Sequence, residues 1–331
     1  MRPSISERLR ILVTGATGPY GAHFAKFCLD QGHEVFSIRR SRRPHDAASL
    51  LGLTDQISWI DGDIRDRELL EHCLADWRVQ AAAHFAALPI VSTAPYMLQA
   101  LWAVNVDGTL ALLDAIHHVN PEILTLFVST DKALGHAGDT PYTEEMRAVP
   151  TAPYDTSKGV AEAICRSYQA MGYIRNLAIT RSCNIIASGD LNWRLIPNTI
   201  RQFLSHVPAK VYTKGQWVRE FIAVEDAVEA QFLCLLRADE KPGETFHIGS
   251  GFQWTQEQAI GYIRENHFPA GVVIRVEPPP HHKIEIPYQR LDCSKIEKQY
   301  GWRAKVPVPT AVDNLVAWWR EHANLASWSM L

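Results

Sequence analysis

Tyr154 and Lys158 stand four positions apart within the stretch APYDTSKGVAEA, residues 152–163. Side chains with this spacing share one face of a helix, so a phenol and an ammonium group would lie side by side. The pairing raises the question of which chemistry needs both groups. A surface helix with a solvated lysine has the same spacing, so the rest of the chain has to decide between the two interpretations.

A glycine-rich stretch, TGATGPYG at residues 14–21, lies between an apolar run and an amphipathic stretch. Gly15, Gly18 and Gly21 give the spacing G-x-x-G-x-x-G. Such glycines permit a tight turn and let the backbone approach a pyrophosphate, which binds at the helix N-terminus. Pro19 suits the first helical turn, where no hydrogen bond is lost. A plain strand-to-helix turn is the alternative, but the context favours dinucleotide binding.

Arginines follow the next apolar run, in the stretch IRRSRR. They occupy four of five positions: Arg39, Arg40, Arg42 and Arg43. A carboxylate for the ribose 2′-hydroxyl of NAD is expected near this point, and none is present there. Guanidinium groups suit a 2′-phosphate, so we expect NADP to be favoured, with NAD possible and a solvated basic loop as the alternative. Asp63 and Ile64, in GDIRD, are expected at the adenine.

The elements that must position these residues follow from the hydrophobic pattern, in which short apolar runs alternate with amphipathic stretches. We predict strands at 10–15, 33–40, 57–66 (with the following turn), 79–88, 123–130 and 176–182. We predict helices at 21–32, 67–77, 96–119 and 154–170. This alternation predicts an α/β protein with a Rossmann-type, doubly wound parallel sheet that is covered by helices on both faces.

The pattern changes after Asn184, which predicts a smaller C-terminal substrate-binding lobe made of non-contiguous pieces. We predict an NAD(P)-binding Rossmann domain at residues 1–185 plus about 218–250. The substrate lobe is predicted at 186–217 and 251–331. Such a lobe would cover the carboxyl ends of the strands, where open α/β sheets bind their ligands.

The composition excludes several classes of protein. The 331 residues are 47% hydrophobic and 21% charged, as in ordinary globular proteins, and a net charge of −3 gives no reason to expect nucleic-acid binding. No apolar run is long enough to span a membrane, and residues 1–10 lack the apolar core of a secretory signal. Six cysteines without C-x-x-C spacing suit a reducing cytoplasm. No metal site is expected, because the histidine pairs at 117–118 and 281–282 lack carboxylates at ligating spacing.

With the glycine loop and the Tyr154-x-x-x-Lys158 motif together, the chain resembles the extended short-chain dehydrogenase/reductases, which are nucleotide-sugar epimerases and dehydratases. HFAAL (84–88) resembles the loop under the nicotinamide, and NVDGT (105–109) resembles N-V-x-G-T on the dimer-forming helix. RSCNII (181–186) resembles the stretch whose asparagine reaches the substrate phosphate. REFIAVEDA (219–227) resembles R-D-F-I-H-V-x-D, whose arginine binds the diphosphate of the nucleotide sugar, although Glu220 and Ala223 depart from that pattern.

The resemblance implies a role for each matching residue. Lys158 would hydrogen-bond the cofactor ribose and stabilise Tyr154 as a phenolate, which takes a proton from a sugar hydroxyl. The implied cofactor site comprises Gly15, Thr17, Gly18, Pro19, Tyr20, Gly21, Arg39, Arg40, Asp63, Ile64, Phe85, Ala86, Ala87, Tyr154 and Lys158. The implied site for a nucleotide-diphosphate hexose comprises Ser129, Asn184, Asn192, Arg194, Leu195, Arg219 and Arg290. A homodimer is expected, through apolar faces of the helices at 96–118 and 154–170.

Asp131 and Lys132 directly follow Ser129 and Thr130 in VSTDKALG, where most epimerases of this family need only a serine or threonine. Elimination of water needs a second acid/base pair, and the family's 4,6-dehydratases have Asp followed by Glu or Lys here. The pair Asp-Lys resembles the CDP-glucose 4,6-dehydratases, as do GDLNWRLIPNTIR (189–201) and LDCSKIEKQYGW (291–302). In contrast, SIRRS (37–41) is closer to the GDP-mannose 4,6-dehydratases, so the nucleobase and the hexose stay open. An exposed ion pair at a strand end is the alternative.

The resemblance therefore predicts a nucleotide-sugar 4,6-dehydratase. Tyr154 acts as base at the C4 hydroxyl, which Thr130 orients. Lys132 removes the C5 proton, Asp131 protonates the leaving C6 hydroxyl, and the hydride returns to C6, giving an NDP-4-keto-6-deoxyhexose. An NDP-sugar epimerase, in which Asp131 and Lys132 are incidental, is one alternative. A non-catalytic dinucleotide sensor is another, although it has no need of Tyr154, Lys158 and Thr130 together.

Overall fold

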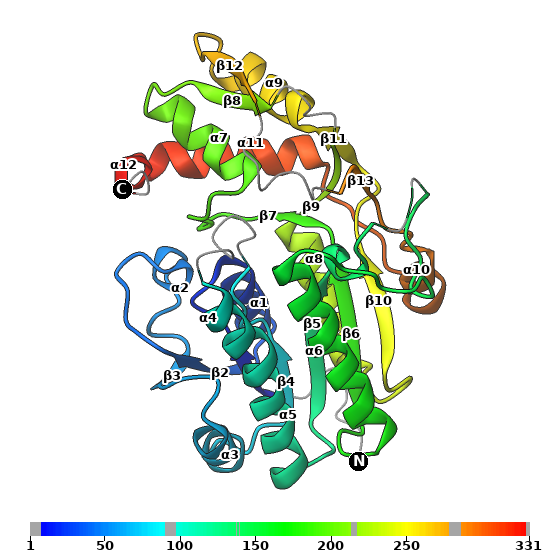
Figure 1. Ribbon diagram of the computed structural model, residues 1–331. Coiled ribbons are helices and arrows are strands. Elements are labelled where there is room, and N and C mark those ends of the chain that lie inside the picture. The colour runs from blue at the N-terminus through cyan, green and yellow to red at the C-terminus, as the bar shows by residue number, and fades with distance from the viewer. Residues whose placement is uncertain are drawn as a thin grey trace.

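A seven-stranded parallel sheet forms the centre of the molecule (Figure 1). The computed structural model describes residues 8–89, 97–136, 138, 140–212, 217–277 and 286–328. The strand order is β3-β2-β1-β4-β5-β6-β10, and every neighbouring pair is parallel. The strands are β1 (Arg10–Thr14), β2 (Glu34–Arg39), β3 (Ser58–Asp61), β4 (Ala81–His84), β5 (Leu124–Thr130), β6 (Leu177–Ser182) and β10 (Glu244–Ile248). The order reverses between β1 and β4, which confirms the predicted doubly wound sheet.

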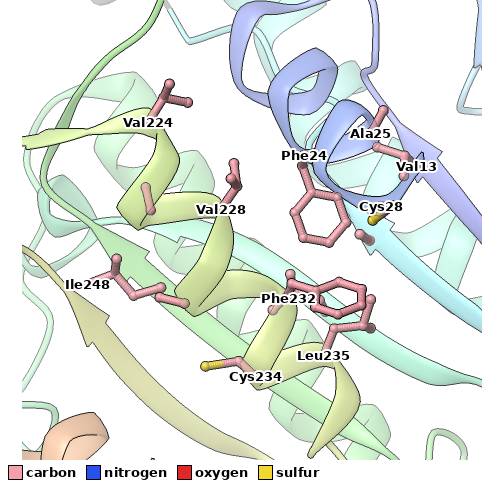
Figure 2. Packing of buried hydrophobic residues seen from close by; sticks show 14 of the residues in the cluster. Val13, Phe24, Ala25, Cys28, Val224, Val228, Phe232, Cys234, Leu235 and Ile248 are labelled. Atoms are coloured by element: carbon pink, nitrogen blue, oxygen red, sulfur yellow. The ribbon is translucent and has the colours of Figure 1, made fainter. Parts of the chain in front are cut away.

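Helices cover both faces of this sheet, because side chains alternate between the faces along each strand. On β1, Ile11 and Val13 join one buried cluster and Leu12 joins the other. The first cluster receives side chains from several helices, among them α1 (Pro19–Asp30), α8 (Val224–Leu236) and α10 (Ser294–Tyr300). Those of the second are α3 (Arg67–Asp76), α5 (Gly108–Val119) and α6 (Pro153–Ala170). Figure 2 shows the first cluster, where Phe24 of α1 faces Phe232 of α8 with ring centroids 6.2 Å apart.

The segment predicted as one helix over residues 96–119 is divided into α4 (Leu98–Trp102), a π-helical turn η2 (Ala103–Asp107) and α5. Asn105 in this turn accepts a hydrogen bond from the Leu88 N–H at 2.7 Å and donates one to Ser157 Oγ at 2.9 Å. The turn therefore ties the loop after β4 to helix α6. The hydrophobic pattern could not show it, because the cause is a polar contact with distant segments.

A second lobe lies next to the carboxyl ends of the central strands (Figure 1). Its strands are β7 (Asn184–Ile186), β8 (Ala209–Tyr212), β9 (Val218–Ala223), β11 (Gln253–Thr255), β12 (Val273–Val276) and β13 (Tyr288–Gln289). Its helices are α7 (Leu195–Leu204), α9 (Gln256–His267), α11 (Val308–Glu321) and α12 (Asn324–Trp328). β9 pairs with β7, β11 and β13, and β8 pairs with β12. Ile200, Ile260, Val312 and Trp319 are buried in its core.

Three parts of the chain differ from the predicted division into domains. β9, expected in the Rossmann domain, belongs to the lobe, whereas β10 of the same segment joins the central sheet and α8 packs in the first cluster. α10, expected in the lobe, buries Ile296 in the first cluster. β7 crosses the boundary expected at residue 185. The pattern of a strand shows which side chains are buried, but it does not show which sheet the strand joins. His281, His282 and residues 1–7 lie outside the described residues.

Two short elements complete the described chain next to the cleft. They are α2 (Ala47–Leu50), which Asp46 caps through a hydrogen bond from the Ser49 N–H, and the 3-10 turn η3 (Asp131–Leu134) directly after β5. Both follow strands of the central sheet, so both stand on the edge where the lobe lies. Neither is visible in the hydrophobic pattern, since each spans only four residues.

Candidate active site

A cleft of about 1370 Å³ separates the carboxyl ends of the central strands from the lobe. A pocket for one small molecule has roughly 300–1,000 Å³, so this cleft has room for two nucleotide-sized ligands. All the residues predicted for the catalytic, cofactor and substrate sites line it, with the exception of Arg290. The topology thus brings together residues that lie far apart in the sequence.

The glycine loop lies so close to the loop after β4 that a side chain at Gly15 would not fit between the two backbones. Gly15 has a φ of +77°, and a Cβ there would lie 2.7 Å from the Ala86 nitrogen. A Cβ on Gly21 would lie 2.4 Å from the Gly15 oxygen. Helix α1 begins at Pro19 without an acidic residue in its first turn, so the positive end of its dipole has no carboxylate of its own. This cradle fits the pyrophosphate of a dinucleotide.

The arginine cluster contains an ion pair that the sequence did not predict. Arg39 Nε lies 2.8 Å from Asp61 Oδ1, and Arg42 Nη2 lies 3.1 Å from Asp61 Oδ2. Hydrogen bonds from Arg39 and then Arg42 hold the pKa of Asp61 below its usual range. Asp61, at the end of β3, thus pairs with two of the four arginines and does not itself line the cleft. Within the described ranges, Arg40 and Arg43 line the cleft without an ion pair.

Tyr154 and Lys158 both line the cleft from the first turns of α6. Their exposed fractions are 9% and 4%, so the alternative of a solvated lysine on a surface helix is wrong. Lys158 Nζ donates to the Val128 carbonyl oxygen at 2.7 Å and lies 4.3 Å from the centroid of the Phe127 ring. Burial lowers the pKa of Lys158 to about 8.

Burial, followed by the nearby charges of Asp155 and Asp131, raises the pKa of Tyr154 above its usual range. Lys158 is directed to a backbone carbonyl oxygen and is not a cause of that shift. The protein alone therefore keeps Tyr154 as a neutral phenol. The predicted phenolate requires a further positive charge in the cleft.

Thr130, Asp131 and Lys132 stand where β5 passes into η3. Thr130 Oγ1 donates to Asp131 Oδ1 at 3.0 Å and accepts from the Lys132 N–H at 3.3 Å. A hydroxyl oxygen accepts two hydrogen bonds, so Thr130 keeps one lone pair for a ligand. Lys132 is half-buried, and its Nζ donates to Gln289 Oε1 at 3.3 Å.

Asp131 is 3% exposed, and its Oδ2 has no hydrogen-bond partner among the described residues. Leaving a buried acceptor unpaired costs about 1–3 kcal/mol. Burial raises the pKa of Asp131, against the opposing influence of Lys132, so the neutral acid is favoured more than in an exposed aspartate. The alternative of an exposed ion pair is therefore wrong for this residue. A protonated carboxyl at the edge of the cleft is a proton donor.

Two residues predicted to bind substrate have other surroundings. Ser129 Oγ donates to Glu162 Oε1 at 2.6 Å, and the buried Glu162 also pairs with Arg181 Nη2 at 2.7 Å. The Ser129 hydroxyl thus belongs to a buried ionic network, although the residue lines the cleft. Arg290 directly follows Gln289, whose amide oxygen accepts from Lys132, and Arg290 itself does not line the cleft. This placement argues against a substrate contact for Arg290.

The start of α7 forms the lobe side of the cleft, through Asn192, Arg194 and Leu195. The Arg194 guanidinium lies over the ring of Tyr20, 4.6 Å from its centroid, and Nη1 is 3.8 Å from Asp190 Oδ2. Asn192 Nδ2 donates to Asp190 Oδ1 at 2.7 Å. Arg194 therefore joins the lobe to the first turn of α1.

The remaining predicted substrate residues lie on neighbouring strands of the lobe. Asn184 Nδ2 donates to the Glu220 carbonyl oxygen at 3.0 Å, and Arg219 lines the cleft one residue before. The Glu220 carboxylate accepts from Gly251 N and Leu291 N, each at 2.7 Å. Burial raises the pKa of Glu220 to about 7. This departure from the family pattern therefore anchors two loops, and Glu220 itself does not line the cleft.

Several residues that line the cleft were not predicted from the sequence. They are Asp190, Trp193, Tyr212, Trp217 and Gln256, among others. Gln256 Oε1 accepts from the Tyr212 N–H at 3.1 Å, which fixes one wall. The cluster of aromatic residues between 193 and 217 was the available signal, since aromatic rings stack on nucleobases.

Two findings concern what the described part of the chain lacks. None of its helices has the length and apolarity needed to cross a bilayer. It also has no group of three or more His, Cys, Asp and Glu side chains placed to hold a metal ion.

The fold and the cleft together define a dinucleotide-dependent enzyme of the short-chain dehydrogenase/reductase type. The glycine cradle, the Tyr154–Lys158 pair and the covering lobe are its three parts. The chain belongs to the NAD dependent epimerase/dehydratase family, whose model matches residues 11–249. This confirms the family named from the sequence.

The names of similar proteins indicate which activity within this family the chain has. The dTDP-D-glucose 4,6-dehydratase of Bos taurus is 28% identical over 98% of this chain and 92% of its own length. The low-salt glycan biosynthesis protein Agl12 of Haloferax volcanii is 32% identical over 77% of this chain and 81% of its own. Both relatives span nearly the same length as this chain, and the bovine relative, which is named a 4,6-dehydratase, supports the predicted nucleotide-sugar 4,6-dehydratase.

Solved structures agree with this result. A dTDP-glucose 4,6-dehydratase from Streptomyces venezuelae, with NAD and TYD bound, matches with a TM-score of 0.86 at 27% identity, over 96% of this chain and 98% of its own. A UDP-glucose 4-epimerase from Thermotoga maritima matches with a TM-score of 0.85 at 22% identity, over 95% of this chain and 100% of its own. The epimerase shows the shared fold and does not distinguish the two reactions.

Proposed function

We propose that this chain removes water from a nucleotide-diphosphate hexose and releases an NDP-4-keto-6-deoxyhexose. The observation that carries the proposal is the buried carboxyl of Asp131, with one unpaired oxygen, next to Lys132 in the cleft that also holds Tyr154. Oxidation at C4 needs Tyr154 alone as its base. A second acid/base pair in the same cleft is needed when the reaction continues to elimination.

A nicotinamide dinucleotide fits the cradle formed by Gly15, Gly21 and the N-terminus of α1. When bound, it supplies a reversible hydride acceptor and, in its oxidised form, a positive charge. Lys158, Phe85 and Ala86 line the cleft next to that cradle and would hold its nicotinamide half. The added positive charge would oppose the rise in the Tyr154 pKa that burial causes.

The first chemical step uses Tyr154 and Thr130. The phenolate oxygen of Tyr154 takes the proton of the C4 hydroxyl, and the Thr130 hydroxyl, which donates to Asp131 in the structure, would turn to donate to the C4 oxygen and so orient it. The C4–H bond breaks with its electron pair, and C4 becomes a ketone. C4 stays a ketone in the product, so Tyr154 gives the proton that it gained to the solvent, and Asp131 takes a proton from the solvent after water has left; each side chain thus ends as it began.

Elimination uses Lys132 and Asp131. The neutral amine of Lys132 takes the C5 proton, which the new ketone has acidified, and the electron pair moves to form the C5–C6 double bond. The C6–O bond breaks, and the hydroxyl leaves as water with the proton of Asp131. Return of hydride to C6 and of a proton to C5 completes the product without net redox change.

A panel of nucleotide-diphosphate hexoses tests this proposal. Mass spectrometry of the reaction mixtures should show loss of one water from at least one member of the panel. Isomerisation without loss of water would support an NDP-sugar epimerase instead. Binding without any change of mass would support a non-catalytic dinucleotide sensor. The same panel identifies the nucleobase and the hexose.

We propose NADP as the preferred dinucleotide, and Arg40 carries this proposal more than Arg39, because Asp61 already pairs with Arg39. Changing Arg39 and Arg40 together to alanine should weaken NADP binding about ten- to a hundred-fold, since hydrogen bonds to a charged group contribute about 1.5–3 kcal/mol. NAD binding should change little. Titration calorimetry of the cofactor-free protein with each dinucleotide measures both values. Equal losses for the two, or tighter NAD binding by the unchanged protein, would contradict the proposal.

We also propose a homodimer formed by α4, α5 and α6. Leu101, Leu112 and Leu113 are buried in the chain itself, whereas Leu98, Trp102, Leu110 and Val160 remain 36–43% exposed. A second copy would cover them. Analytical ultracentrifugation at micromolar concentration should give the mass of two chains, and changing Leu110 to glutamate should give the mass of one. A single-chain mass for the unchanged protein refutes the dimer.

We further propose that the protein works in the cytoplasm. All six cysteines are free thiols, and five of them are buried. Free thiols of this kind suit a reducing compartment. The division of the chain remains a proposal as well, with a dinucleotide-binding part built on the central sheet and a substrate lobe built around β9.

A further inference from the structure

Gln289 is the residue of the lobe that contacts the acid/base pair of the cleft. Its side chain is completely buried, and its Oε1 accepts from Lys132 Nζ at 3.3 Å. The two residues are 157 positions apart in the sequence, and Gln289 lies on the short strand β13. In this contact Lys132 donates, and the amide oxygen of Gln289 is the atom that faces it.

The segment that carries Gln289 is fixed from two sides. On one side, the segment is hydrogen-bonded to β9. The Val218 N–H donates to the Pro287 carbonyl oxygen at 2.9 Å, and the Leu291 N–H donates to the Glu220 carboxylate at 2.7 Å. On the other side, Tyr142 N donates to the Arg290 carbonyl oxygen, and Tyr142 O accepts from Asp292 N, both at 2.8 Å. A side chain on such a segment has little freedom to move.

The chemistry of the partner matters as much as its position. A carboxylate facing Lys132 would stabilise the ammonium form and oppose its use as a base. A carboxamide holds the nitrogen in place without adding charge. Because the amide oxygen accepts only from N–H, the lone pair of a neutral Lys132 cannot point at Gln289 and remains available to the cleft.

The other groups around the pair are already accounted for. The positive charges of Lys132 and of Arg219 on β9 oppose the rise in the Asp131 pKa that burial causes. The charge of Asp131 in turn adds to the rise that burial causes in the pKa values of Glu220 on β9, Tyr154 on α6 and Cys183 after β6. Glu220 is held by two backbone N–H groups. Gln289 carries no charge, and it faces Lys132, the residue that must lose a proton before it can act.

We propose that Gln289 is a positioning residue for Lys132, holding its amino group at the cleft while leaving it free to work as the base at C5. The proposal rests on the dehydratase function for its kinetic consequences. Its structural content, the hold of Gln289 on Lys132, does not depend on turnover.

The test compares Gln289→Glu with Gln289→Met, two changes of nearly equal volume. Gln289→Glu should move the acid limb of the rate of water loss upward by about one pH unit or more, giving at least about a tenfold loss at neutral pH. Gln289→Met should lower the rate about tenfold at every pH without moving the limb. Reduction of the bound cofactor by substrate should persist in both, because it does not need Lys132.

Gln31→Glu adds the same charge at an exposed position at the end of α1 and serves as the matched control, with an unchanged profile. Profiles of both Gln289 variants that superimpose on that of the unchanged protein would overturn the proposal. If Gln289→Glu fails to fold, as judged by cofactor retention and circular dichroism, Gln289→Met decides alone: an unchanged rate overturns the proposal.

A second measurement separates failure of this inference from failure of the proposed function. In protein with lysine labelled with carbon-13 at Cε, the Lys132 signal, assigned by its loss in Lys132→Met, can be titrated without substrate. Its titration midpoint should move to higher pH in Gln289→Glu and stay in place in Gln31→Glu. An unmoved midpoint in Gln289→Glu overturns the inference even if dehydration is observed, and a moved midpoint supports it even if no hexose of the panel loses water.

Discussion

Tyr154→Phe is expected to abolish both cofactor reduction and product formation, with a loss of about a hundred- to ten-thousand-fold. The phenol is the base for the C4 hydroxyl, and no later step can begin before C4 is a ketone. The ring itself is kept, so packing around its position next to Leu101 is preserved. Single-turnover measurement of the near-ultraviolet absorbance of reduced nicotinamide, with product followed by mass spectrometry, checks both parts.

Tyr173→Phe is the matched control, because this tyrosine is 39% exposed and does not line the cleft. It should react as the unchanged protein does. A Tyr154→Phe variant that still reduces its cofactor at more than about a tenth of the original rate would show that another group takes the C4 proton.

Asp131→Asn is expected to give the opposite pattern: reduced cofactor accumulates, but product falls by about a hundred-fold or more. The asparagine keeps the shape of the side chain and removes the proton that the leaving C6 hydroxyl needs. Oxidation at C4 does not use that proton. Stopped-flow absorbance should show cofactor reduction that is not followed by reoxidation, whereas the unchanged protein shows only a transient.

The pH dependence of elimination gives a second test of Asp131 as the general acid. Burial raises the pKa of Asp131, so the carboxyl remains protonated to a higher pH than an exposed aspartate would. As a general acid it works only while protonated, so elimination should slow as the pH rises through that raised value. Asp131→Asn should not show this decrease in rate with rising pH. Asp55→Asn, which changes an exposed aspartate, should still show it. Equal product rates for Asp131→Asn and the unchanged protein would make Asp131 incidental, as the epimerase alternative holds.

Much of the fold could be predicted because local pattern and global topology agree. The strands β1, β2, β4, β5 and β6 are nearly continuous apolar runs, as strands covered on both faces must be, and the helices between them carry apolar stripes. What escaped depends on contacts between distant segments. The π-helical turn at Asn105 and the assignment of β9 to the lobe are both decided by partners that no local pattern contains.

The candidate site also contains residues that motifs predicted and contacts that they did not predict. Motif residues such as Gly15, Tyr154 and Asp131 reach the cleft because each stands at a fixed offset from the end of a strand or the start of a helix. Contacts between side chains of different strands could not be read from spacing: Asp61 of β3 pairs with Arg39 of the neighbouring strand β2, and Gln289 of the lobe accepts from Lys132. Arg290 was expected among the substrate-binding residues, and it is the one member of the predicted site that does not line the cleft.

The fate of the hydrogen at C4 tests the central claim most directly. With the NDP-hexose that loses water, deuterated at C4, the product should carry deuterium at C6, and the reaction in D2O should place solvent deuterium at C5. Nuclear magnetic resonance of the isolated product locates both labels in one experiment. If the C4 label stays at C4 and C5 gains nothing from the solvent, the chain does not catalyse 4,6-dehydration, and the roles given to Asp131 and Lys132 are wrong.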